Sequence, residues 1–158
     1  MDVFHEHFRT AWNALWAAAT SSGGGSSKGK GLSRGGRGVI SDGLAFVAQL
    51  EIHHSIEETY IFPILAKRMP EFRSDGKGAK AAELLRQHKD IHVGMEGMET
   101  YLRACRDGDR ELDMPTLKAQ MESWGAVLWK HLDQEVQTLG AENMRKYWTV
   151  EEIRRIPM

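Results

Sequence analysis

The segment EIHHSIEE at residues 51–58 decides how this chain of 158 residues folds. His53 precedes Glu57 by four positions, and His54 precedes Glu58 by the same interval. Residues four apart lie above one another on the same face of an α-helix. Each pair can therefore direct one nitrogen and one oxygen atom to a common point, and we predict a helix that presents metal-ligand pairs.

The same spacing recurs further along the chain. His88-x3-His92 lies within QHKDIH at residues 87–92, and His131-x3-Glu135 within HLDQE at residues 131–135. In all, the chain has one His-x3-His pair and four His-x3-Glu pairs, whereas its composition predicts about 0.3 and about 0.6 by chance. The excess indicates a site assembled from several helices.

Apolar residues repeat at helical spacing in four long segments separated by strong helix breakers. We predict helices over residues 2–20, 41–69, 78–106 and 114–139, and a short C-terminal helix over 150–155, where Thr149 and Glu152 have the spacing of a capping box. Pro63 should bend or end the regular part of the second helix. The fold class expected is all-α, an antiparallel up-and-down four-helix bundle with a short C-terminal helix.

Each predicted long helix carries polar residues on its most apolar stripe. Buried ionisable groups need partners or must stay neutral, so a shared metal centre explains these residues together better than separate core histidines do. The candidate ligands are His5, beside Phe8 and Trp12; His53 and Glu57, beside Phe46, Leu50, Tyr60 and Ile64; His88 and His92, beside Leu85 and Met95; and His131 and Glu135, beside Trp124 and Leu128.

Length, composition and charge limit the classes of protein. One domain over residues 1–158 is expected, with a flexible, basic Gly/Ser-rich loop at about 21–40. The net charge of −1 gives no strong nucleic-acid signal, no apolar run is long enough for a membrane helix, and no signal peptide is recognised. The single cysteine, Cys105, requires no oxidising compartment. We expect a cytoplasmic monomer without a membrane partner.

With these residues in view, the sequence resembles the hemerythrin-like family, the HHE cation-binding domains. The resemblance rests on the ordered series formed by His5, HHSIEE followed by Ile61-Phe62-Pro63, QHKDIH and HLDQE. It implies a four-helix bundle that holds two non-heme irons bridged by an oxo or hydroxo group. Imidazole and carboxylate ligands suit iron on chemical grounds, and they also suit zinc or manganese.

The resemblance also implies a role for each ligand. His88, His92 and His131 would bind one iron, His5 and His53 the other, and Glu57 and Glu135 would bridge them. The second iron would keep an open position for O2 or a related small diatomic ligand. We therefore expect an O2-binding, storage or sensing protein rather than an enzyme. The alternatives are a di-iron oxidoreductase acting on peroxide, nitric oxide or an organic substrate, and an iron- or oxygen-responsive regulatory bundle.

Several other residues have alternative assignments on the sequence alone. His7 is an alternative ligand to His5, and His54 with Glu58 could orient neighbouring ligands, although their displacement of about 100° from the stripe favours a more exposed pairing. Tyr60 and Trp124 are expected in the core, where they could also line an O2 pocket. The last motif is His-x3-Glu rather than the His-x4-Asp of invertebrate oxygen carriers, and this is the pattern of the functionally mixed wider family.

Overall fold

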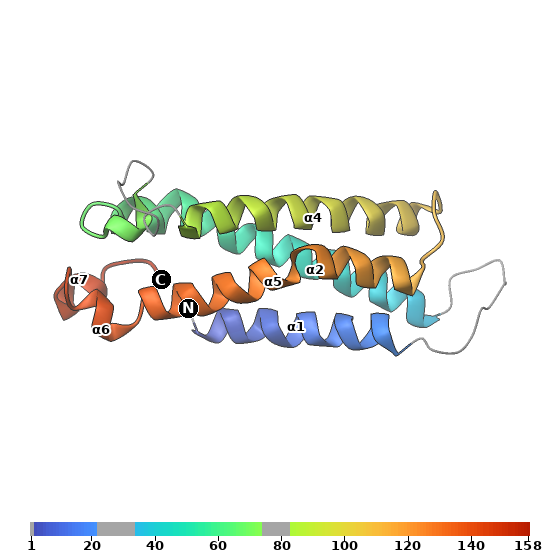
Figure 1. Cartoon of the computed structure of the whole chain (residues 1–158), viewed down its shortest axis with the longest axis horizontal. Coiled ribbons are helices and arrows are strands. Elements are labelled where there is room, and N and C mark those ends of the chain that lie inside the picture. The colour runs from blue at the N-terminus through green and yellow to red at the C-terminus, as the bar shows by residue number, and fades with distance from the viewer. Residues whose placement is uncertain (1, 22–33, 74–82) are drawn as a thin grey trace.

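The computed structural model describes residues 2–21, 34–73 and 83–158, and this part of the chain is helical without any strand. Four long helices lie side by side along the longest axis of the molecule (Figure 1). They are α1 (Asp2–Thr20), α2 (Arg34–Ile56), α4 (Glu83–Asp107) and α5 (Met114–Thr138). Helix α1 contacts α2 and α5, and α4 contacts the same two helices, so the four enclose one core.

The second helix does not continue regularly to residue 69 as predicted. It changes at Glu57 into a π-helical turn, η1 (Glu57–Ile61), in which the Phe62 amide donates to the carbonyl of Glu57, and then into the short α3 (Phe62–Leu65) with Pro63 in its first turn. The 3-10 turn η2 (Pro70–Phe72) follows. The expectation that Pro63 ends the regular helix is consistent with this change of helix type.

The π turn also changes which side chains face the core. A π turn inserts one extra residue into the helical repeat, so Ile61, Phe62 and Leu65 are buried after Glu57 in place of the predicted Tyr60 and Ile64. Tyr60 is 61% exposed. The prediction that Tyr60 lies in the core or beside a buried pocket is therefore wrong.

Most other helix boundaries lie close to the prediction. Helix α5 begins at Met114, where the side chain of Asp113 accepts a hydrogen bond from the Thr116 amide, and α7 (Val150–Ile153) begins with the predicted capping box of Thr149 and Glu152. A further short helix, α6 (Ala141–Met144), follows α5.

The largest boundary difference is at the start of α2. This helix begins at Arg34, so the last part of the segment expected to be a loop is helical. Residues 22–33 of that predicted loop, and residues 78–82 of the predicted third helix, lie outside the described residues.

The core has two apolar parts with a polar layer between them. One part, which includes Leu50, Ile91 and Leu128, fills the space among α1, α2, α4 and α5. The other, which includes Ile61 and Leu84, lies among η1, α3, the start of α4 and the C-terminal helices. Along α2, α4 and α5, the buried polar residues fall where one apolar part gives way to the other.

None of the helices among the described residues combines the length and apolar character needed to cross a bilayer.

Candidate metal centre

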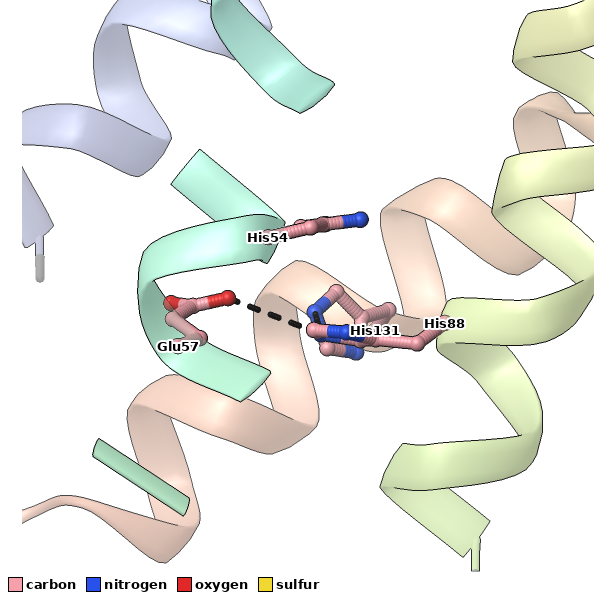
Figure 2. Close-up of side chains that lie close together, drawn as sticks. All are labelled: His54, Glu57, His88 and His131. Carbon is pink, nitrogen blue, oxygen red and sulfur yellow. Dashed lines mark hydrogen bonds and ion pairs between the residues drawn. The ribbon is translucent and has the colours of Figure 1, made fainter. Parts of the chain in front are cut away.

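The buried polar layer contains two groups of potential ligands. The first consists of His54, Glu57, His88 and His131, which are contributed by α2, η1, α4 and α5 and point toward one another (Figure 2). All four residues are buried, with at most 1% of their surface exposed. The Nε2 atoms of His88 and His131 are 3.2 Å apart, and Oε2 of Glu57 is 3.5 Å from Nε2 of His88.

The outer ring nitrogens of His88 and His131 have hydrogen-bond partners that define their tautomers. Nδ1 of His88 donates to Glu58 at 2.7 Å, and Nδ1 of His131 donates to Oε1 of Gln87 at 3.2 Å. Gln87 is held in this orientation because its own amide donates to Gln134. A neutral imidazole protonated on Nδ1 carries a lone pair on Nε2. Both Nε2 lone pairs therefore face the interior, where a cation would satisfy them.

Burial keeps the histidines of this group neutral. It lowers the pKa of His131 to about 3, and it lowers the pKa of His54 well below its ordinary value, with the neighbouring imidazoles lowering both further. Burial likewise lowers the pKa of His88, although the hydrogen bond to Glu58 offsets part of this effect. Neutral imidazole is the form that binds a metal ion.

The second group consists of His5, His53, Glu57 and Glu135. Nε2 of His5 is 3.1 Å from Oε2 of Glu135, and Nε2 of His53 is 3.0 Å from Oε1 of Glu57. These four atoms are close enough for hydrogen bonds, yet none of them has a partner in hydrogen-bonding geometry within the described structure. Each of the four residues offers one ligand atom, and these atoms lie within 4.8 Å of one another.

Glu57 belongs to both groups. One of its oxygens lies next to His53 and the other next to His88. Oε2 of Glu135 similarly approaches His5 at 3.1 Å and His131 at 3.5 Å. Glu57 is thus placed to bridge an ion in each group, and one oxygen of Glu135 lies next to a histidine of each group.

The two carboxylates titrate differently in the protein without metal. Burial and the charge of Glu135 raise the pKa of Glu57 to about 10. Burial acts in the same direction on Glu135, but the close approach of Nε2 of His5, together with the neighbouring His131, lowers its pKa overall. At neutral pH the pair therefore retains one proton on Glu57.

These observations fit a pair of metal ions. A buried polar atom without a hydrogen-bond partner carries a large free-energy cost. Within the two groups, the atoms without a partner among the described residues are both ring nitrogens of His5 and of His54, Nε2 of His53, and both oxygens of Glu57 and of Glu135. Two ions would satisfy atoms of all five residues. A mixed imidazole and carboxylate donor set is typical of iron, and it also binds zinc and manganese.

The structure brings six of the seven predicted ligands into these two groups. The exception is His92, whose side chain is 32% exposed and hydrogen-bonded to Glu51 and Glu58. Together with Glu58 and His88 it forms a third, outer group. His54 lies in the position that the family resemblance had assigned to His92.

The burial of His54 differs from the exposed position that we expected. Helix α2 packs against α1 on one side and α4 on another, so two neighbouring faces of it are buried, and both His53 and His54 point inward. The sequence carried a signal for this, because Val47 and Leu50 lie seven and four residues before His54. His7, the alternative to His5, is exposed and contacts Gln49.

Comparison with known proteins agrees with this geometry. Residues 1–142 match the model of the hemerythrin HHE cation-binding domain. This chain belongs to the hemerythrin family. A curated relative in this comparison is the dimeric xanthone biosynthesis cluster protein R11 of Cryptosporiopsis sp. (strain 8999), which is 28% identical over 111 residues.

That alignment covers 65% of this chain but only 38% of the length of the relative. No solved structure matches the chain significantly. As a hemerythrin-family domain, the chain is a cation-binding helical protein, and its clustered His and Glu side chains form the candidate site.

Proposed function

We propose that this chain is a non-heme di-iron protein that binds O2 inside an antiparallel, up-and-down four-helix bundle. One observation carries the proposal. Nitrogen and oxygen atoms from α1, α2, η1, α4 and α5 converge in two groups that share a carboxylate, and many of these atoms lack hydrogen-bond partners among the described residues.

The residues of each group have separate tasks in this proposal. His54, His88 and His131 would hold one iron, His5 and His53 the other, and Glu57 and Glu135 would be shared between them. An iron pair bound here would supply two electrons and a coordination position for O2. Glu58 and Gln87 keep the donor lone pairs of His88 and His131 directed inward, and the two apolar parts of the core limit access of water to the site.

Anaerobic reconstitution with Fe(II) tests the proposal. We expect two irons per chain and, on admission of air, new visible absorption bands that disappear when oxygen is removed. Retention of fewer than two irons would contradict the assignment of a di-iron site. Irreversible oxidation of a fully loaded protein would contradict reversible O2 binding and favour the second candidate function.

The second candidate is a redox enzyme that acts on peroxide, nitric oxide or an organic substrate. It is favoured by the name of the curated relative, a biosynthesis cluster protein. Because only 38% of that relative is covered, its activity does not transfer directly. Sustained turnover of one of these substrates by the iron-loaded protein, with no stable O2 adduct, is the result expected of an enzyme.

A further inference from the structure

A groove of about 980 Å³ lies on the outer side of His88, between α3, η2 and the first half of α4. Its apolar wall includes Phe62, Pro63, Ala66 and Leu85. Phe62 forms the link to the metal centre, because its ring centroid is 5.0 Å from that of His88. The groove thus adjoins the candidate metal centre but contains none of its inner ligands.

The rim of the groove is strongly cationic. Four of its lining residues are basic, namely Lys67, Arg73, Arg86 and Lys89, and its acidic lining residue is Glu58. Lys67 and Lys89 are exposed and form no ion pair with any residue that the structure describes. A basic rim above an apolar wall would attract a molecule with both an anionic group and an apolar body.

The Glu58 carboxylate is already bound to two histidines and does not pair with the lysines of the rim. Its Oε1 already accepts hydrogen bonds from Nδ1 of His88 at 2.7 Å and from Nε2 of His92 at 3.3 Å. These bonds hold the carboxylate on the side of the groove nearest to the metal centre. The two lysine ammonium groups therefore remain available to an incoming anion.

We infer that this groove binds a small aromatic carboxylate, with its ring against Pro63, Ala66 and Leu85 and its anionic group between Lys67 and Lys89. An aromatic body suits the site because a flat ring can bury its face against these side chains. The inference does not depend on which metal the protein holds.

The probe for a direct test is 1-naphthoate, titrated calorimetrically into the full chain as purified, with its metal content measured. Two reference compounds separate the parts of the recognition: 1-naphthalenemethanol keeps the rings without the charge, and acetate keeps the charge without the rings. We expect each to bind at least about tenfold more weakly than naphthoate.

Variants locate the binding. Lys67→Gln combined with Lys89→Gln should weaken naphthoate binding by about tenfold, because two exposed charge interactions are lost, and should leave the binding of the neutral alcohol unchanged. Lys118→Gln is the matched control, since Lys118 is on α5 and interacts with Glu122 and Trp16. It should leave the affinity for naphthoate within about twofold.

Three results would overturn the inference. They are equal affinities for naphthoate and the neutral alcohol, equal affinities for acetate and naphthoate, and unchanged naphthoate binding in the double-lysine variant. Loss of iron binding with retained naphthoate binding would instead count against the proposed di-iron function alone, so the two proposals fail separately.

Discussion

The imidazole rings of His54 and His88 are stacked, with centroids 4.0 Å apart and planes inclined by 16°. Both rings are buried, and His54 has no hydrogen-bond partner for either ring nitrogen within the described structure. His88, in contrast, is fixed by Glu58. A buried, neutral and unpartnered imidazole beside a well-oriented ligand favours His54 as the third histidine of the first iron.

His54→Ala should therefore reduce iron content from two ions toward one, because the first group would keep only two histidines. His92→Ala is the matched control, since His92 is one turn from His88 on the same helix but outside both inner groups. We expect it to retain two irons. Metal analysis after reconstitution measures both, with circular dichroism to verify helix content.

The opposite result, with iron lost in His92→Ala and retained in His54→Ala, would restore the ligand set that the family resemblance implied. Equal loss in both variants would indicate that the outer group of Glu58, His88 and His92 also takes part in metal binding.

Much of the fold followed from apolar periodicity and helix breakers, because both are local properties of the sequence. The capping box at Thr149 and the start of α5 at Met114 were predictable for this reason. The position of the π turn at Glu57 was not, since Pro63 signals a break in the regular helix but does not specify the turn at which the backbone hydrogen bonding changes. Tyr60 was consequently placed on the wrong face.

The candidate site was predictable to a similar degree. Spacing identified the ligand pairs, but it could not decide between His54 and His92, because either can face a neighbouring helix in a bundle. That choice depends on which faces of α2 and α4 are covered. The start of α2 at Arg34 was missed because composition favoured a loop over Gly35–Gly38, whereas the segment continues a helix that is stabilised by packing of Ile40.

Glu58→Gln should lower iron affinity by about 10- to 100-fold, the usual effect of removing a carboxylate that orients a ligating histidine. The amide is a weaker acceptor for Nδ1 of His88, so the lone pair on Nε2 becomes less basic and less well directed. Glu51→Gln is the control, because Glu51 is exposed on α2 and contacts His92 instead. Competition with a coloured chelator gives both affinities; similar losses in the two variants would indicate a general charge effect.

The stability of the metal-free protein should be greatest near neutral pH. Histidines such as His131 have a folded-state pKa below the ordinary 6.5, so the stability that they contribute is present above pH 6.5 and is lost as the pH falls. Glu57 has a folded-state pKa above the ordinary 4.5. The stability that protonated Glu57 contributes to the folded state is therefore present at low pH and is lost as the pH rises toward about 10.

Between pH 7 and 9, the free energy of unfolding should fall by about 1.4 kcal/mol per pH unit, since the folded state binds one more proton than the unfolded state. Glu57→Gln should remove this alkaline loss, because the amide does not titrate. Urea unfolding across this pH range measures the slope. A slope that is the same in the wild-type protein and the variant would show that Glu57 does not hold the proton.

Gly94→Ala should destabilise the bundle, because a Cβ at this position overlaps the side chain of Trp124. That indole cannot move aside easily, since its ring packs edge-on against Trp12 with centroids 4.9 Å apart. Overpacking of this kind typically costs about 1–3 kcal/mol.

Gly97→Ala on the same helix is the control for Gly94→Ala. A Cβ at Gly97 would meet only the flexible end of Gln120 at 3.3 Å, and alanine favours a helix over glycine by about 1 kcal/mol. Thermal unfolding should therefore show a lower Tm for Gly94→Ala and an equal or higher Tm for Gly97→Ala. Equal shifts in the two variants would mean that α4 and α5 separate enough to admit a methyl group beside Trp124.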